Sequence, residues 1–139
     1  MAFEVRSTRD KDACVVCVVG EVDLYSSPSL KSTLMAMAEG DTSLVIVDLG
    51  AATFIDSAGI GVPVGALRRA KESGDELRVV CNQNNIAKIL RLTGLDRVLP
   101  IFDTVEHALQ TEADVVGAPD RRPPRRRLSD ESLDGLRRT

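Results

Sequence analysis

Asp56-Ser57-Ala58-Gly59-Ile60-Gly61 is the stretch that decides the fold of this chain. Immediately before it, residues 44–49 (LVIVDL) form a short apolar run, which is typical of a buried strand. After it, apolar residues recur at three- and four-residue spacing and predict a helix that ends near residue 74: Ile60, Val64 and Leu67. Ser57 therefore lies where a central strand gives way to a helix, which is where open α/β sheets carry their functional groups.

The start of such a helix suits an anion. Its first backbone N–H groups have no partner within the helix, and the helix dipole places partial positive charge there. A phosphate on the Ser57 hydroxyl would sit among these donors, and Gly59 and Gly61 would let a large partner approach the backbone closely. A purely structural alternative stays open, because Ser and Asp are favoured N-cap residues of any helix and glycine is common in turns.

Outward from this stretch, strand-like and helix-like segments alternate. We expect strands near residues 3–6, 13–19, 44–49, 76–81 and 98–102, and helices that begin near residues 26–28, 57, 82–85 and 103–104. The order β-β-α-β-α-β-α-β-α predicts an α/β fold, with a mixed, mostly parallel sheet of four or five strands flanked by about four helices, the first two strands forming an antiparallel hairpin.

Three local expectations accompany this order. Residues 8–12 are polar and predict a turn, and residues 50–55 predict a loop that Phe54 and Ile55 anchor to the core. Pro100 lacks a backbone donor, so the last strand is expected at an edge of the sheet.

The chain is long enough for one domain, predicted at residues 1–116. Residues 117–139 differ in composition: from Ala118 on, seven arginines stand against four acidic residues, a net charge of +3, whereas the preceding part carries −6. Residues 121–127 show no apolar periodicity and predict a disordered Arg/Pro-rich tail. Because acidic residues dilute its charge and no aromatic residues interleave, we expect no direct contact with nucleic acid and none with a membrane.

The composition is that of an ordinary soluble protein, with 43% hydrophobic and 28% charged residues. No apolar run approaches the roughly 18 residues needed to cross a bilayer, and the first residues have no signal-peptide core. These features predict a cytoplasmic protein.

Cys14 and Cys17 match the C-x-x-C motif in spacing only. They lie in a predicted strand, where residues three apart point to opposite faces, and no second Cys/His pair completes a metal site. We interpret them as small core residues, and the odd total of three cysteines argues against a secreted disulfide scaffold. Redox control through Cys17 or Cys81 stays an alternative if their strands are adjacent.

The sequence indicates no enzyme active site. The only histidine, His107, is far along the chain from Ser57, and a catalytic serine needs a base. Gly59-Ile60-Gly61 lacks the third glycine and the acidic residue of a dinucleotide fingerprint. Asp23, Asp48 and Asp56 could gather at strand ends around a hard cation, but carboxylates are common at solvated strand ends. We therefore predict no catalytic residue, no metal and no cofactor.

Several pieces, taken in order, resemble the anti-sigma-factor antagonists of the bacterial STAS-domain family. Gly20-Glu21-Val22-Asp23 is similar to the family's G-E-[LIV]-D after the second strand. Residues 44–48 followed by 54–61 resemble its central strand and D-S-[ST]-G-[LIV]-G signature, and Thr93-Gly94-Leu95 resembles the end of its third helix. The similarity covers about residues 3–111, with Ala58 where most members have a second Ser or Thr.

The resemblance implies a phosphorylation switch in a partner-switching system. The serine after the signature aspartate is the phosphoacceptor, which here is Ser57. The unphosphorylated antagonist binds an anti-sigma factor that is also an ATP-dependent serine kinase, and so releases the sigma factor. Phosphorylation blocks binding, and a metal-dependent serine phosphatase restores it. The expected partner contacts are Asp23, Asp56, Ser57, Ala58, Gly59, Ile60 and Gly61.

Other functions remain open on the sequence alone. The same fold could serve as a phosphorylation-independent scaffold or as a small-molecule sensor subunit of a signalling assembly. An unrecognised hydrolase is a further alternative.

Overall fold

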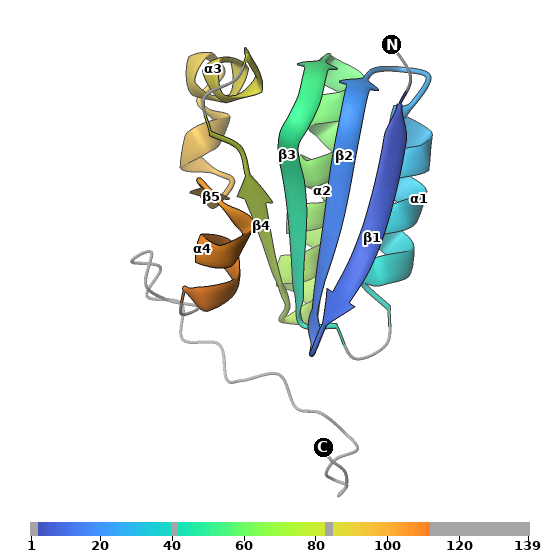
Figure 1. The fold of residues 1–139 in the computed structure, drawn as a ribbon, viewed down its shortest axis with the longest axis vertical. Coiled ribbons are helices and arrows are strands. Elements are labelled where there is room, and N and C mark those ends of the chain that lie inside the picture. Colours follow the sequence, from blue (N-terminus) through green and yellow to red (C-terminus); the bar gives the residue numbers. More distant parts are fainter. Residues whose placement is uncertain (1–2, 40–41, 83–84, 112–139) are drawn as a thin grey trace, which may run out of the picture.

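A mixed sheet with helices on both faces forms the body of the molecule (Figure 1). The computed structural model describes residues 3–39, 42–82 and 85–111. Within these ranges there are five strands, β1 (Glu4–Asp10), β2 (Ala13–Val22), β3 (Leu44–Ile55), β4 (Glu76–Val80) and β5 (Ile101–Phe102). They are paired in the order β1-β2-β3-β4-β5, with β1 antiparallel to β2 and every other pair parallel. The predicted mixed, mostly parallel sheet is confirmed.

The helices of the described residues are α1 (Ser27–Met37), α2 (Ser57–Ser73), α3 (Asn85–Leu92) and α4 (Val105–Gln110), and a 3-10 turn, η1 (Leu95–Arg97), follows α3. Helices α1 and α2 lie side by side behind the sheet, while α4 packs near β4 and β5 and α3 lies beyond the upper end of β4 (Figure 1). The predicted alternation of strands and helices is confirmed, and η1 is an addition to it. None of these helices is long and apolar enough to cross a membrane.

The core follows from the two-residue alternation of the strands. Even-numbered residues of β2 and odd-numbered residues of β4 and of β3 up to Leu49 point towards α1 and α2, and several of them are fully buried: Val16, Val18, Val47 and Val79. Each such side chain stabilises the fold by about 1.5–3 kcal/mol on burial. A second, smaller cluster occupies the other face, under α4: Ile46, Val80, Phe102 and Ala108. The sheet is therefore well covered on one face and only partly covered on the other.

The hairpin at the start is tighter than predicted. The expected turn over residues 8–12 is wrong, because β1 continues to Asp10 and pairs there with Ala13. Only Lys11 and Asp12 lie between the strands, and Lys11 has a positive φ of 62°. Strand β1 lies at the edge of the sheet and its residues are mostly exposed, so polar residues that resemble a turn in sequence can remain in the strand.

The predicted loop over residues 50–55 is also wrong, because β3 runs on to Ile55, opposite Val22 of β2. The register shifts twice along this pair, once between Cys17 and Val19 and once between Gly20 and Glu21. Such bulges add a residue to one strand and break its alternation, which is why the segment looks like a loop in sequence. Ile55 is buried in the core as expected, whereas Phe54 is 46% exposed.

The last strand is shorter than the predicted residues 98–102. Strand β5 contains only Ile101 and Phe102, because η1 follows Gly94, whose φ is +79°. Strand β5 lies at an edge, as Pro100 predicted, and the Pro100 carbonyl accepts a hydrogen bond of 2.8 Å from the Val79 N–H.

Helix α4 is held to the sheet by a buried arginine. Arg78 of β4 is 4% exposed and donates hydrogen bonds to the carbonyls of Ala108 and Thr111. Helix α4 begins near residues 103–104 as predicted, and Thr104 caps it, its hydroxyl accepting from the His107 N–H at 3.0 Å. The predicted disordered tail over residues 117–139 lies outside the described residues, and the domain boundary near 116 stays a prediction.

Candidate functional site

Ser57 is the first residue of α2, directly after β3, and its side chain is exposed. The pairing of Ile55 with Val22 brings the ends of β3 and β2 together. Residues 23–26, which follow β2, therefore lie beside the start of α2, at the upper end of the sheet in Figure 1. The predicted strand-to-helix position of Ser57 is confirmed.

Asp56, and not Ser57, caps the helix. Its backbone is extended, with φ −107° and ψ −173°, and one carboxylate oxygen accepts from the Gly59 N–H at 2.9 Å. The other oxygen accepts from the Leu24 N–H at 3.1 Å. One side chain thus satisfies a free donor of α2 and ties the helix to the loop after β2. The Ser57 hydroxyl is left out of the cap.

Gly59 and Gly61 play different parts. Gly59 is buried, and a Cβ placed there would lie 2.6 Å from the Val22 carbonyl oxygen and 2.8 Å from Cγ1 of Ile55. Its missing side chain lets α2 approach β2 of the same chain, so the expectation that it opens the backbone to a partner is wrong. A Cβ at Gly61 would meet nothing within 4 Å, and Gly61 is exposed.

The two other signature residues of this turn, Ala58 and Ile60, are less exposed than Ser57 and Gly61. Ile60 is half-buried and packs against the main core. Ala58 is also half-buried and lines a groove between α1 and α2, together with Gly61. Of the predicted contact residues in this turn, Ser57 and Gly61 are exposed, while Gly59 and Ile60 face inward.

Asp23 shapes the loop that lies beside the start of α2. One of its carboxylate oxygens accepts from the backbone N–H groups of Tyr25 and Ser26, both at 3.0 Å. These donors, Ser26 foremost, hold the pKa of Asp23 below its ordinary value. Ser26 stands at the N-cap position of α1, but its hydroxyl turns back to accept from the Asp23 N–H at 2.9 Å and to donate to the Glu21 carbonyl at 2.8 Å. Helix α1 begins within the predicted residues 26–28, but the Ser26 hydroxyl does not cap it.

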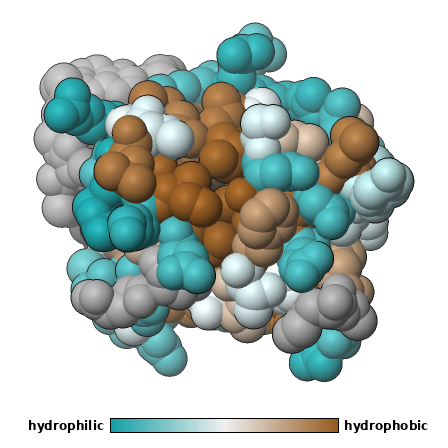
Figure 2. All heavy atoms as spheres, turned by 90° about the horizontal axis from the view of Figure 1, so that it is seen from above, coloured by the Kyte–Doolittle hydropathy of each residue, from teal (hydrophilic) through white to brown (hydrophobic). Residues whose placement is uncertain are grey.

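Three large side chains at this end of the sheet are exposed: Leu24 by 63%, Tyr25 by 88% and Phe54 by 46%. Figure 2 looks down on this end and shows hydrophobic side chains gathered in its middle, with hydrophilic ones around them. An apolar centre with a polar rim is the usual anatomy of a protein-binding surface. Leu24 and Tyr25 were not among the predicted contact residues, although two large side chains directly after Asp23 were a usable signal.

His107 and Asp48 do not join the residues around Ser57. His107 lies in α4, with its ring at a centroid distance of 5.2 Å from that of Phe102, and α4 lies away from the upper end of the sheet where α2 begins (Figure 1). Asp48 lies within β3, where it accepts from the Gly50 N–H at 2.9 Å, and not at the strand ends that carry Asp23 and Asp56. Within the described ranges, no group of three or more His, Cys, Asp or Glu side chains is placed to hold a metal ion.

The cysteines do not form a redox pair. Cys14 is buried with the even-numbered valines of β2, while Cys17, on the other face, is half-buried, so their predicted separation is confirmed. Strand β3 lies between Cys17 of β2 and Cys81 after β4, and two strand spacings of about 4.8 Å exceed the reach of a disulfide. Burial, with Asp48 nearby, raises the pKa of Cys81 to about 11. A disulfide between Cys17 and Cys81 is thus excluded by the sheet order.

Comparison with known proteins agrees with this geometry. A family model described as the STAS domain matches residues 4–108. An anti-sigma-B factor antagonist of Listeria monocytogenes is 29% identical over 101 residues, covering 73% of this chain and 88% of that protein. One from Staphylococcus aureus is 27% identical over 106 residues, covering 76% and 98%. The crystal structure of an anti-sigma factor antagonist from Mycobacterium paratuberculosis matches with a TM-score of 0.66 at 25% identity, over 78% of this chain and 92% of that one.

Proposed function

The chain belongs to the STAS domain family, and from this premise we propose that it is an anti-sigma-factor antagonist that binds its partner through the start of α2 and the loop of residues 23–26. The observation that carries the proposal is the exposed Ser57 at the first position of α2, with Leu24, Tyr25 and Phe54 exposed at the same end of the sheet. The relatives named as anti-sigma-B factor antagonists support the assignment.

The surface suits tight binding because its backbone is already ordered. Asp56 bonds both Gly59 and Leu24, and Asp23 bonds two N–H groups of its own loop. Docking of a partner therefore loses little conformational entropy in this loop, and such ordering is one of the main free-energy costs of association. The exposed Leu24 and Tyr25 supply the apolar and aromatic contacts that dominate such interfaces.

Phosphorylation of Ser57 would end binding by charge and bulk, without unfolding the domain. A phosphate adds about −1.5 to −2 charges at neutral pH, and the N-terminus of α2 tolerates them because its dipole is positive there. Asp23 and Asp56 already place carboxylates beside this point. A partner surface packed against Ser57 would therefore meet a concentrated negative patch. Ala58 leaves Ser57 as the single hydroxyl of the signature.

In this proposal the partner is an anti-sigma factor with serine kinase activity, located with this chain in the cytoplasm. The unphosphorylated form captures this partner and frees the sigma factor, and a serine phosphatase returns the phosphorylated form to the binding state. No cofactor is needed by the chain itself, because binding and release depend only on the state of Ser57.

The test is to incubate the full chain with ATP and each candidate anti-sigma kinase of the same genome, and to measure its intact mass. We expect one phosphate with one kinase, and none on Ser57→Ala. Titration calorimetry should show that Ser57→Ala binds that kinase like the wild type, and that Ser57→Glu binds about 100-fold more weakly, a loss near 2.8 kcal/mol.

Ser32→Glu is the matched control, because Ser32 is exposed on α1 and takes the same change of charge. It should bind like the wild type. Equal affinities of the wild type, Ser57→Ala and Ser57→Glu would refute the phosphorylation switch and favour a scaffold role that does not depend on phosphate.

A further inference from the structure

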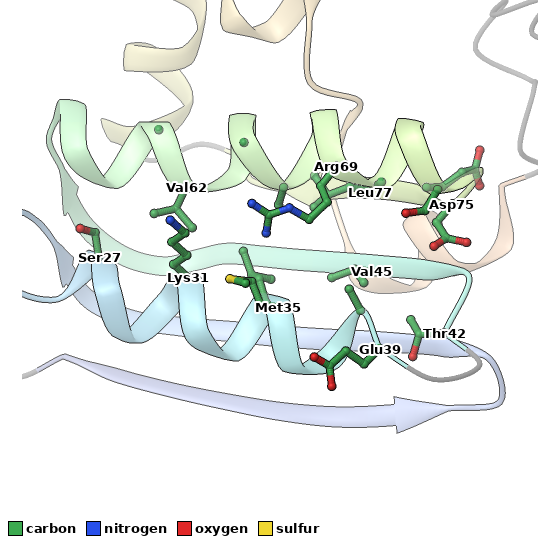
Figure 3. Close-up of a pocket in the computed structure, with 18 of the residues that line it drawn as sticks. Ser27, Lys31, Met35, Glu39, Thr42, Val45, Val62, Arg69, Asp75 and Leu77 are labelled. Carbon is green, nitrogen blue, oxygen red and sulfur yellow. The ribbon is translucent and has the colours of Figure 1, made fainter.

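A groove of about 660 Å³ runs between α1 and α2, on the helical side of the sheet (Figure 3). Its floor and walls are mainly apolar, formed by Leu34, Met35, Val45, Val62 and Leu77. A volume of this size and an apolar lining with a few polar groups are typical of small-molecule sites. Ala58 and Gly61 line the end of the groove beside Ser57, but the groove continues along both helices to Glu39 and Asp75, beyond the proposed partner contacts.

The groove exists because α2 presents very small residues towards α1. Gly61, Gly65, Ala66 and Ala70 all line it, and they offer few atoms to fill the space between two helices that are both packed on the sheet. A Cβ placed on Gly65 would meet nothing within 4 Å. The space is therefore open, and a side chain or a ligand can enter it without displacing protein atoms.

Two cations point into this space from its two walls. Figure 3 shows Lys31 extending from α1 towards α2, and Arg69 extending from α2 over the groove, with Met35 on the α1 side. In the part of the chain that the structure describes, neither Lys31 nor Arg69 makes an ion pair. Glu39 and Asp75 lie towards the opposite end of the groove (Figure 3). One end thus combines positive charge with an adjacent apolar strip.

We propose that this groove binds an amphiphilic carboxylate of the fatty-acid type. The carboxylate lies between Lys31 and Arg69, where charge-assisted hydrogen bonds to an ammonium and a guanidinium are available. The alkyl chain lies along Met35 and Val62 and removes both from water, which is the main driving force for an apolar chain. The acidic end of the groove directs the head group away from Glu39.

The experiment uses the full ¹⁵N-labelled chain without any partner, and dodecanoate below its micelle-forming concentration as the probe. We expect saturable NMR shift changes in the amides of α1 and α2 around Met35 and Gly65. Dodecyltrimethylammonium, with the same chain and the opposite charge, should bind at least tenfold more weakly.

Three variants locate the site. Lys31→Glu and Arg69→Glu should each weaken dodecanoate binding about tenfold or more. Arg68→Glu is the matched control, because Arg68 is the exposed neighbour of Arg69 and does not line the groove. The affinity of this variant for dodecanoate should stay within twofold of that of the wild type. Gly65→Leu should fill the groove and abolish binding, while its spectrum stays that of a folded protein, because its Cβ meets open space.

The proposal is overturned if no saturable shifts occur, if the cationic amphiphile binds equally well, or if Gly65→Leu binds dodecanoate like the wild type. It is also overturned if the ligand-free groove amides shift with protein concentration or on removal of residues 112–139, since a second copy or the chain's own C-terminal segment would then be the occupant. None of these outcomes affects the Ser57 experiments, which measure partner binding and phosphate transfer.

Discussion

Asp23 and Asp56 lie at neighbouring strand ends and both accept from backbone N–H groups, but their hydrogen bonds connect different parts of the chain. Asp23 bonds Tyr25 and Ser26, which belong to its own turn. Asp56 bonds Gly59 in its own helix and Leu24, which lies 32 residues away along the chain. The difference teaches that the signature aspartate is first an architectural residue, which presents Ser57 by joining the two segments beside it.

The largest expected effect comes from the junction itself. Gly59→Ala would place a Cβ 2.6 Å from the Val22 carbonyl oxygen, and such overpacking should lower the free energy of unfolding by about 2–3 kcal/mol. Gly61→Ala, two residues further on, meets open space and should raise it by about 0.5–1 kcal/mol, because alanine is the better helix former. Urea unfolding of the two variants measures both. Similar stabilities would show that α2 is not pinned to β2 at Gly59.

The second test separates the two aspartates directly. Asp56→Ala removes an N-cap and should cost about 1–2 kcal/mol, and it also frees the Leu24 N–H. Asp23→Ala should cost less, because its donors lie in one exposed turn. Hydrogen exchange by NMR gives the specific signature: Leu24 should lose protection in Asp56→Ala and keep it in Asp23→Ala. Loss of Leu24 protection in both variants would mean that the loop depends on Asp23 as much as on Asp56.

The smallest effect is the pH dependence of the Asp23 turn. Its pKa is lowered from the ordinary value of 3.8 by the Ser26 N–H and its neighbours. A lowered pKa in the folded state stabilises the fold above the ordinary value, and this contribution is lost as the pH falls through the folded pKa. Carboxyl ¹³C shifts should therefore place the midpoint of Asp23 below 3.8. The stability difference between the wild type and Asp23→Asn should shrink as acid is added, and a midpoint at or above 3.8 would contradict the bonding described for this turn.

The architecture could be predicted because burial imposes a period on the sequence. The apolar run of residues 44–49 and the three- and four-residue spacing of Ile60, Val64 and Leu67 indicate a strand and a helix without any tertiary information. The continuation of β3 to Ile55 could not be predicted, because two register shifts break its alternation. The end of β1 was missed because the polar residues of an edge strand resemble a turn. The start of β5 was missed because the turn after Gly94 resembles a strand in sequence.

The position of Ser57 at the start of a helix could be predicted, but the bonding of Asp56 and the packing of Gly59 could not. Ser and Asp are both good caps, so the sequence did not distinguish them, and the second bond of Asp56, from the Leu24 N–H, depends on the pairing of β2 with β3. The inward role of Gly59 depends on the same pairing. The α1–α2 groove could not be predicted from the sequence, because it depends on how far apart the two helices lie on the sheet.

The close approach of α2 to β2 at Gly59 also has a consequence for protein engineering. Asp56 and Gly59 serve the chain's own structure, Asp56 as the cap of α2 and Gly59 at the contact of α2 with β2. Ser57 and Gly61 face outward on the same turn, and Leu24 and Tyr25 beside them are exposed. A library that varies only these four outward positions, while Asp56 and Gly59 stay fixed, could search for new partners on an unchanged framework.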